Sequence, residues 1–303
     1  MEFKKILVPT DYSDLSLKAF EAANTFAELF GAKVTPYHCY IPLSDVDNMN
    51  IFGVEHAKRE EEVKDSLLKR LNSVAAEFVD QKYLEPGVVE VGKPSSGIVD
   101  YGENFDLIVM TTNGRTGFSR LLMGSVAERV LRTSVTPVVV VEEFSKLAPI
   151  KKLLVTTDLS ENSESVMPYA CGIAKITGAS VDLVHIISTE NYGRFEEAST
   201  EAEERKPRVK ELVSKHFSDI EDKVKGEVLV SSKSPHEALF DLDFARKYNL
   251  ICMSTIGKTG LKYMMLGSTT SNVARNVETA VLCFNPKAKH HYIRDKKQEQ
   301  EVS

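Results

Sequence analysis

The sequence is poor in cysteine, and its few cysteines follow no pattern. The four residues Cys39, Cys171, Cys252 and Cys283 lie far apart and form no CxxC pair. This spacing excludes a disulfide framework and a cysteine-ligated zinc site. We therefore expect all four side chains to be buried free thiols.

The chain also has no long hydrophobic run and no excess of positive charge. No stretch reaches the ~20 consecutive apolar residues that a membrane-spanning helix requires, and the segment MEFKKILVPTD leads into a strand-like run instead of a secretory signal. The net charge of −6 leaves no basic footprint for nucleic acid. We expect a cytoplasmic protein whose partners include neither nucleic acid nor a membrane.

Several catalytic signatures are missing as well. No Walker Lys-Ser/Thr pair follows a glycine-rich loop, no Ser-Gly-Gly loop follows the first strand-like run, and no Gly-x-Ser-x-Gly nucleophile elbow occurs. No cluster of carboxylates suggests a catalytic metal site. These absences favour a binding protein over an enzyme, with no catalytic residue and no metal ligand to assign.

What the sequence does contain is an internal repeat. KKILVPTDYS at residues 4–13 aligns without a gap with KKLLVTTDLS at residues 151–160, an offset of 147. LIVMTTNGRTGFSRLLMGS at residues 107–125 matches LICMSTIGKTGLKYMMLGS at residues 250–268, at an offset of 143. The second copy is therefore four residues shorter in its middle, which a shortened loop would explain. The repeat indicates two copies of one domain.

The 303 residues are long enough for two domains, each with its own core. We expect domain 1 at residues 1–143, domain 2 at residues 150–286 and a charged C-terminal tail at residues 287–303. The join, EEFSKLAPI at residues 142–150, is too short to be a flexible tether. The two halves should therefore pack together.

Short apolar runs alternate with longer amphipathic stretches in each copy. This alternation predicts a parallel sheet with right-handed crossovers and helices on both faces. The expected fold class is α/β, with two tandem doubly wound, Rossmann-like domains of five parallel strands each, and with ligands at the carboxyl ends of the strands. The strands expected in the first copy are KILVPT, KVTPYHCY, VVEV, DLIVMTT and PVVVVE, separated by helices that include residues 20–30, 63–78 and 125–134 and a short one from Pro94.

The segment after the fourth expected strand has the composition of an anion site. Gly114 and Gly117 allow positive φ and close backbone approach, and Gly124-Ser125 opens a helix whose free N–H groups favour phosphate. A Gly-Ser pair is also a common helix cap, so spacing alone leaves both interpretations open. The second copy repeats the arrangement with Gly257, Gly260, Gly267 and Ser268.

This segment resembles the universal stress protein family, whose nucleotide-binding members carry Gly-x2-Gly-x9-Gly-Ser/Thr after strand four. Gly114, nine residues and then Gly124-Ser125 fit the latter part of that pattern. The resemblance covers nearly all of both halves and implies an adenine nucleotide alpha hydrolase-like fold. The same spacing recurs at Gly257, Gly267 and Ser268.

Both copies depart from the family pattern at its first glycine, which falls at Thr111 and at Ser254. If that position is left-handed, a residue other than glycine costs about 1 kcal/mol there and weakens nucleotide binding. Alternatively, the hydroxyl side chain contacts phosphate itself. The departure motivates a second hypothesis, in which the protein is a nucleotide-free scaffold of the same fold that binds other proteins.

The resemblance further implies that the acidic residue after strand one faces the adenosine. This residue is Asp11 in the first copy and Asp158 in the second. Each is followed two positions later by a serine, Ser13 or Ser160, so the alternative is that the aspartate simply caps the first helix. Both roles are compatible in one side chain.

Two further pairs match across the copies. Arg115 and Lys258 are candidate phosphate partners or solvated loop charges. His38 and His185 have no ligand-spaced partner, which favours core or pocket-rim histidines over metal ligands. The residues expected around a nucleotide are Pro9, Thr10, Asp11, His38, Met110, Thr111, Gly114, Arg115, Gly117, Gly124, Ser125, Val126, Thr157, Asp158, Ser254, Gly257, Lys258, Gly260, Gly267, Ser268 and Thr269.

The leading hypothesis is therefore a stress-response regulator that binds ATP or AMP, with or without Mg²⁺, in one or both domains and has little or no catalytic activity. A weak ATPase is a third hypothesis. The first copy is favoured as the better site because it keeps Pro9 and the cationic Arg115 and Arg120. The resemblance also implies pairing of the final strands, PVVVVE and AVLCFN, as a pseudo-dimer within one chain, with a homodimer as further assembly.

Overall fold

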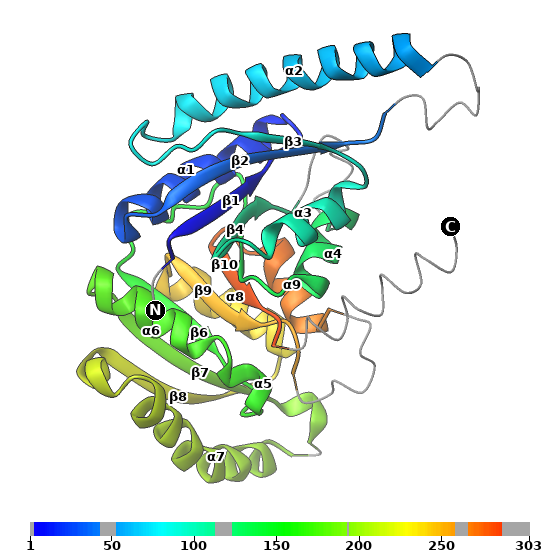
Figure 1. Cartoon of the computed structure of the whole chain (residues 1–303). Coiled ribbons are helices and arrows are strands. Elements are labelled where there is room, and N and C mark those ends of the chain that lie inside the picture. The colour runs from blue at the N-terminus through cyan, green and yellow to red at the C-terminus, as the bar shows by residue number, and fades with distance from the viewer. Residues whose placement is uncertain (1–2, 43–52, 113–122, 193, 258–265, 287–303) are drawn as a thin grey trace.

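The computed structural model describes residues 3–42, 53–112, 123–192, 194–257 and 266–286 (Figure 1). Domain 1 has the element order expected from its alternating pattern. Its strands are β1 (Lys5–Pro9), β2 (Lys33–Tyr40), β3 (Val88–Val91), β4 (Leu107–Thr111) and β5 (Val138–Val141), and its helices are α1 (Asp14–Phe30), α2 (Gly53–Phe78), α3 (Pro94–Gly102) and α4 (Ser125–Thr133).

Domain 2 repeats this order with two changes. Its first helix is divided into α5 (Glu161–Glu164) and α6 (Met167–Thr177), because Pro168 has no N–H to continue the helical ladder. Short 3₁₀ turns flank its long helix, η2 (Thr189–Asn191) and η3 (Ser218–Lys223). The other elements are β6 (Lys152–Thr156), β7 (Ser180–Ser188), α7 (Phe195–His216), β8 (Val224–Ser231), α8 (Pro235–Arg246), β9 (Leu250–Ser254), α9 (Ser268–Asn276) and β10 (Ala280–Phe284).

The strands of both domains form one ten-stranded sheet in the order β3-β2-β1-β4-β5-β10-β9-β6-β7-β8. All pairs within a domain are parallel, whereas β5 and β10 pair antiparallel, with Val140 opposite Val281. The expected α/β fold with two doubly wound domains is confirmed. The final strands pair within the chain, as the resemblance implied. The homodimer stays a prediction.

Helices cover both faces of the sheet (Figure 1). Buried side chains of α1, α6 and α7 pack in one hydrophobic layer, and those of α3, α4, α8 and α9 pack in the other. The antiparallel join therefore keeps matching helices of the two domains on the same face while reversing the strand direction. As a result, the carboxyl ends of the domain-1 strands and those of the domain-2 strands lie at opposite edges of the sheet.

Local sequence signals explain where the first helix starts and ends. The Ser13 hydroxyl accepts a hydrogen bond from the N–H of Ser16 and caps the N-terminus of α1. Gly31 ends the helix with φ of 66°, in the left-handed conformation that glycine adopts at low cost, and the expected stop is confirmed. Gly178 ends α6 in the same way with φ of 71°.

The two domains pack closely, as the short join predicts. The linker side chains of Leu147 and Ile150 are 5% exposed and belong to the same hydrophobic layer as α1 and α6. The ring of Phe3 stacks on Tyr169 at a centroid distance of 6.1 Å. The Ser145 hydroxyl donates to the carbonyl of Glu278, 2.7 Å away in the other domain.

Strand register shows that the copies differ by more than one loop. Val88 pairs with Tyr37 and Glu227 pairs with Val184, so the offset between the copies is 139 at β3 and β8. The offset returns to 143 at β4 and β9. Up to its third strand, domain 2 is thus eight residues shorter than domain 1. Between the third and fourth strands it is four residues longer than domain 1. A single shortened loop is the wrong explanation, because residues added before α8 and within α8 offset half of the loss.

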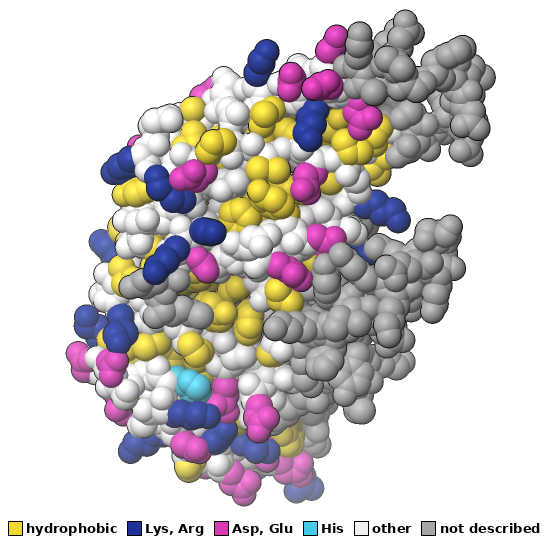
Figure 2. Space-filling view, viewed as in Figure 1, with side chains coloured by type: hydrophobic (Ala, Val, Ile, Leu, Met, Phe, Trp, Pro, Cys, Tyr) yellow, Lys and Arg dark blue, Asp and Glu magenta, His cyan; other side chains and the backbone are white. Residues whose placement is uncertain are grey.

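Basic and acidic side chains are intermixed on the face shown in Figure 2. Exposed pairs such as Lys18 with Glu21, at 2.8 Å, contribute little to stability because water screens them. Among the residues that the structure describes, no helix combines the length and the apolar character needed to cross a bilayer. Residues 287–303, the expected charged tail, lie outside the described residues.

Candidate functional site

Each domain has a cavity at the carboxyl edge of its strands. The strand order reverses direction between β1 and β4, and between β6 and β9, which is where open α/β sheets bind ligands. The cavity volume is about 350 Å³ in domain 1 and about 400 Å³ in domain 2, within the range for small-molecule sites. The two cavities therefore open at opposite edges of the continuous sheet.

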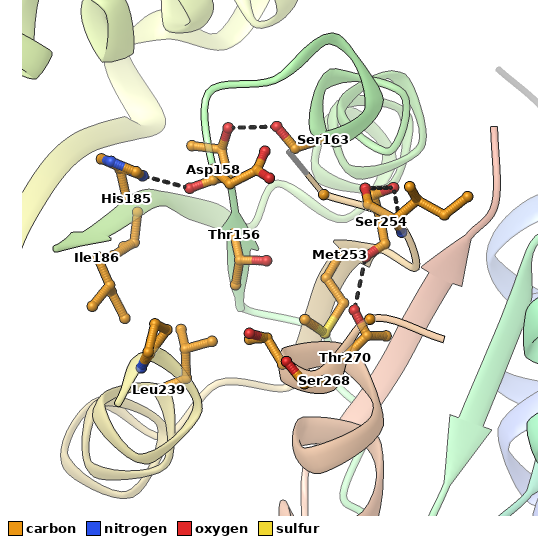
Figure 3. A pocket seen from close by; sticks show the side chains of 17 residues that line it. Thr156, Asp158, Ser163, His185, Ile186, Leu239, Met253, Ser254, Ser268 and Thr270 are labelled. Carbon is orange, nitrogen blue, oxygen red and sulfur yellow. Dashed lines mark hydrogen bonds between the residues drawn. The ribbon is translucent and has the colours of Figure 1, made fainter. Parts of the chain in front are cut away.

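Both cavities are lined by the ends of the first, second and fourth strands and by the starts of two helices. Domain 1 contributes Pro9, Thr10, Asp11, Ser16, Tyr37, Cys39, Pro94, Ile98, Met110, Thr111, Thr112, Gly124, Ser125, Val126 and Ala127. Domain 2, drawn in Figure 3, contributes Thr156, Thr157, Asp158, Ser163, Val184, His185, Ile186, Pro235, Leu239, Met253, Ser254, Ile256, Gly257, Gly267, Ser268, Thr269 and Thr270.

The turn after the first strand has the same strained geometry in both domains. Tyr12 adopts φ of 63° and Leu159 φ of 64°, a conformation that costs residues other than glycine about 1–2 kcal/mol. The Thr10 hydroxyl accepts from the N–H of Tyr12 at 3.0 Å, and Thr157 holds Leu159 in the same way at 3.0 Å. These bonds hold the backbone in a conformation that turns the intervening aspartate toward the cavity.

The aspartate and the helix cap are separate residues. Asp11 Oδ1 accepts from the N–H of Ser13 at 3.0 Å and from its hydroxyl at 2.6 Å, and the Ser13 hydroxyl in turn accepts from Ser16. Asp158 and Ser160 repeat the arrangement. Each aspartate therefore lines a cavity while orienting the residue that caps the helix, so the two interpretations of the sequence are compatible.

The two matched histidines are not equivalent. Nδ1 of His38 donates to the Thr10 carbonyl and Nδ1 of His185 to the Thr157 carbonyl, both at 2.8 Å. His185 lines the domain-2 cavity, as a pocket-rim histidine would. His38 is not among the described residues that line the domain-1 cavity, and its ring packs 4.5 Å from the ring of Tyr12 and stacks on Tyr40, as a core histidine would.

The residues at the family's first glycine position are not strained. Thr111 and Ser254 are the last residues of β4 and β9, and neither has a positive φ. The expected cost of a left-handed residue is therefore wrong for both. The Ser254 hydroxyl donates to the carbonyl of Ile256 at 3.0 Å, so it closes a local turn at the cavity wall.

Position 257 requires glycine because a larger side chain has no room there. Its φ lies outside the left-handed region, so the backbone conformation does not require glycine. A Cβ at this position would lie 2.4 Å from Oδ2 of Asp158. The glycine thus lets the backbone after β9 approach the carboxylate after β6, as expected for close approach. Five expected residues lie outside the described part of the chain: Gly114, Arg115, Gly117, Lys258 and Gly260.

The helices α4 and α9 begin at the cavities without a side-chain cap. Gly124 and Gly267 are their N-cap residues, and no side-chain hydrogen bond closes either first turn. The glycine N–H groups are used elsewhere, since they donate to the carbonyls of Thr112 and Thr255 at 2.9 and 3.0 Å. The first-turn residues of both helices line the cavities, and the N–H groups of a helix start together with the helix dipole favour an anion.

The wall of the domain-1 cavity contains a polar pair that domain 2 lacks. The Tyr37 hydroxyl donates to Oε2 of Glu90 at 2.6 Å, and burial together with this bond raises the pKa of Tyr37, which keeps it a neutral donor. Burial also raises the pKa of the neighbouring Cys39 thiol. Strand register places Val184 and Leu229 at the positions of Tyr37 and Glu90.

The sequence did not point to several lining residues. The lining residues that it missed include Pro94 and Ile98 in domain 1 and Pro235 and Leu239 in domain 2, which belong to the first two turns of α3 and α8. These helices contact the second strand of their domain. The proline at each helix start was the available signal. Within the described residues, no group of three or more His, Cys, Asp and Glu side chains could hold a metal ion.

The fold and the cavities define a doubly wound α/β protein with a ligand-sized site at the switch point of each half. The chain belongs to the universal stress protein family, whose sequence profile matches residues 2–142 and again residues 149–285. Each half therefore carries the family domain, and the chain is a tandem member.

Individual relatives agree with this assignment. The chain is 39% identical over 151 residues to universal stress protein MJ0531 of Methanocaldococcus jannaschii, an alignment that covers 48% of this chain and 85% of that protein. It is 23% identical over 287 residues to a universal stress protein of Mycolicibacterium smegmatis, with 93% and 97% covered. The crystal structure of a universal stress protein from Archaeoglobus fulgidus has the same fold, with a TM-score of 0.62 at 21% identity over 93% of this chain and 96% of the other.

Proposed function

We propose that this protein is a stress-response regulator that binds an adenine nucleotide, ATP or AMP, in the cavities of its two domains and catalyses little or no reaction. One observation carries the proposal. Each cavity places the uncapped N-terminus of a helix, α4 or α9, in one site with an aspartate, Asp11 or Asp158. The helix start suits phosphate, and the aspartate suits the hydroxyl groups of ribose.

The remaining lining residues supply an apolar surface for a base. Ile98 and Met110 in domain 1 correspond to Leu239 and Met253 in domain 2. A planar base buried against such side chains would gain hydrophobic stabilisation, while the exposed main chain at the end of the second strand would provide hydrogen bonds to its edge. The arrangement thus matches the three parts of a nucleotide.

Bound Mg²⁺ would enter with a nucleotide. Magnesium in nucleotide sites is held mainly by phosphates and water, with one or two carboxylates. Among the described lining residues, Asp11 is the one carboxylate of the domain-1 cavity and Asp158 that of the domain-2 cavity. One carboxylate per cavity fits a metal that accompanies the ligand, and it supplies little of what phosphoryl transfer requires.

The first experiment is to denature protein purified without added nucleotide and to identify the released molecules by mass spectrometry. One or two equivalents of adenine nucleotide per chain support the proposal. If none is released, ATP and AMP are titrated to millimolar concentration and binding is followed by calorimetry. Absence of binding in that titration contradicts the proposal and supports the nucleotide-free scaffold.

Catalysis is tested separately by measuring phosphate release from ATP. We expect release at the background rate of the buffer. Release above background that is lost in Asp11→Ala or Asp158→Ala would show a weak ATPase and contradict the proposed absence of catalysis. Release that the double variant Asp11→Ala with Asp158→Ala retains would indicate a contaminating enzyme, because this variant lacks the described carboxylate of both cavities.

A further inference from the structure

The two cavities differ at their polar ends. Thr156 at the end of β6 stands where domain 1 has Pro9 at the end of β1, since both follow the same register with the second strand. In the first turns of the helices, Thr269 of α9 corresponds to Val126 of α4. Domain 2 therefore has two hydroxyl groups at positions where domain 1 has only carbon.

Both of these threonines are placed to meet a ligand. Thr156 and Thr269 line the domain-2 cavity, and both are partly exposed. Among the described residues, no hydrogen bond occupies either hydroxyl. Figure 3 shows Thr156 between Asp158 and His185 on one side and Ser268 on the other. A ligand that extends from the aspartate to the start of α9 passes these hydroxyls.

A third threonine fixes the start of α9. The Thr270 hydroxyl donates to the carbonyl of Ser254 at 2.8 Å and ties the first turn of the helix to the end of β9. Ala127 occupies the matching position in domain 1 and cannot form this bond. The helix start in domain 2 is thus held in place before a ligand arrives, which lowers the ordering cost of binding.

The apolar side chains Ile98 and Met110 have close counterparts in Leu239 and Met253, and the hydroxyl groups of Thr156 and Thr269 lie toward the part of the ligand that carries phosphate. Both cavities share a helix start that favours phosphate, but among the described residues Thr269 and Thr156 add two hydroxyl donors in domain 2 where Val126 and Pro9 add none in domain 1. Additional donors favour the ligand that carries more phosphate oxygens.

We infer that the two cavities are specialised, the domain-2 cavity for an adenine nucleotide with a phosphate chain, ADP or ATP, and the domain-1 cavity for adenosine or AMP. The inference rests on the proposed function, because it assigns ligands to the same two sites. The hydroxyls of Thr156 and Thr269 and the tether from Thr270 are the features that distinguish them. Specialised sites would let one chain respond to two adenine compounds at once.

The test uses full-length chains with one cavity blocked. Gly124 and Gly267 line the two cavities, so Gly124→Gln and Gly267→Gln are expected to fill them. The backbone at both positions has negative φ. Calorimetry then measures the dissociation constants of ATP, AMP and adenosine. We expect Gly124→Gln to bind ATP about tenfold or more tightly than AMP, the effect of one hydrogen bond to a charged group, and Gly267→Gln to bind AMP or adenosine at least as tightly as ATP.

Matched swaps test the named hydroxyls. Adding Thr156→Val and Thr269→Val to Gly124→Gln should lower the ATP preference about tenfold, because valine keeps the shape and removes the donor. Adding Val126→Thr to Gly267→Gln should raise the ATP preference. In the unsubstituted chain, ATP should fill one tight site per chain and leave a second that AMP still fills, which keeps the test valid if a glutamine variant fails to fold.

The outcomes separate the inference from the proposed function. If both cavities bind nucleotide with the same order of preference, or if the threonine swaps leave that order unchanged, specialisation is wrong and the proposed function stands. If the unsubstituted chain binds none of the three compounds, the proposed function itself fails.

Discussion

Gly257 and Asp158 lie in contact across the domain-2 cavity, although 99 residues separate them in sequence. A methyl group on Gly257 would lie 2.4 Å from Oδ2 of the aspartate, while Oδ1 is held by the N–H and the hydroxyl of Ser160. The carboxylate thus has little freedom to move away. The contact joins the turn after β6 to the loop after β9 and makes both part of one site.

Gly257→Ala should therefore impair binding more than folding. We expect nucleotide affinity at domain 2 to fall about tenfold, because the carboxylate is displaced from its hydrogen-bonded position. The free energy of unfolding should change by less than about 1 kcal/mol, because φ at Gly257 is already compatible with alanine and Asp158 is partly exposed. Calorimetry in the Gly124→Gln background and urea denaturation give the two quantities. Unchanged affinity would show that the carboxylate does not touch the ligand.

A glycine that ends a helix should affect stability and leave nucleotide binding unchanged, the opposite of Gly257. Gly31 has φ of 66° and no atom within 4 Å of an added Cβ, so the cost of Gly31→Ala is conformational alone. We expect a loss of about 1 kcal/mol in stability with nucleotide affinity unchanged, and a smaller loss for Gly31→Asn, which tolerates the left-handed conformation. Urea denaturation checks the order of the two variants. An equal loss for both would mean that packing, and not φ, determines the cost.

Tyr37 and Gly97 should be energetically coupled. A Cβ on Gly97 would lie 2.5 Å from the Tyr37 hydroxyl, so Gly97→Ala should cost about 2 kcal/mol through overpacking. Domain 2 has Val184 and Ala238 at these positions, which suggests the compensating change. In the double variant Tyr37→Val with Gly97→Ala, the loss should be at least about 1 kcal/mol smaller than the sum of the single losses. Additive losses in urea denaturation would contradict the contact.

Glu164 should make stability depend on pH. The Glu164 side chain is 8% exposed, and its carboxylate accepts from Arg208 and Lys215 at 2.6 Å and pairs with His216 at 3.0 Å. Burial acts to raise the pKa of Glu164, but the bonds from Lys215 and His216 and the charges of Lys215 and Arg208 outweigh it and lower the pKa below its usual value. A lowered folded-state pKa stabilises the protein above the unfolded-state pKa of about 4.3, and this stabilisation is lost as pH falls through the folded-state pKa.

Glu164→Gln should therefore lower the free energy of unfolding by about 2 kcal/mol at pH 7, and the difference from the unsubstituted chain should shrink as pH falls below about 4. Urea denaturation at a series of pH values measures both. Glu211→Gln is the matched control, because Glu211 pairs with the same Arg208 but its side chain is 60% exposed. A difference that stays constant down to pH 3 would contradict the role of the charged carboxylate.

The sequence predicted most of the fold because the signals involved are local. The apolar runs and the glycine at position 31 lie within single elements, so periodicity and capping chemistry located them. The glycine pattern likewise placed Gly124 and Gly267 at helix starts beside a cavity. The expectation that failed at Thr111 and Ser254 concerned the backbone angle φ. Both residues end a strand, and the strand conformation sets φ there whatever the residue type.

His38 shows why the list of site residues could not be completed from the sequence. It matches His185 in the repeat and makes the same bond to a threonine carbonyl, yet only His185 lines a cavity. His38 packs against two rings, Tyr12 in the turn after β1 and Tyr40 on its own strand, and domain 2 has Leu159 and Ile187 at these positions. A repeat predicts equivalent backbones, but it does not predict equivalent surroundings.

The sequence by itself determined that the chain is two α/β domains of one family, because the repeat, the alternation of elements and the helix signals are written in neighbouring residues. Only the tertiary structure decided that β5 and β10 pair antiparallel, that the two cavities open at opposite edges of the sheet, and that Gly257 meets Asp158. These features join segments that lie about a hundred positions or more apart in the sequence. Packing of the whole sheet sets the register between such segments, and no local signal can do so.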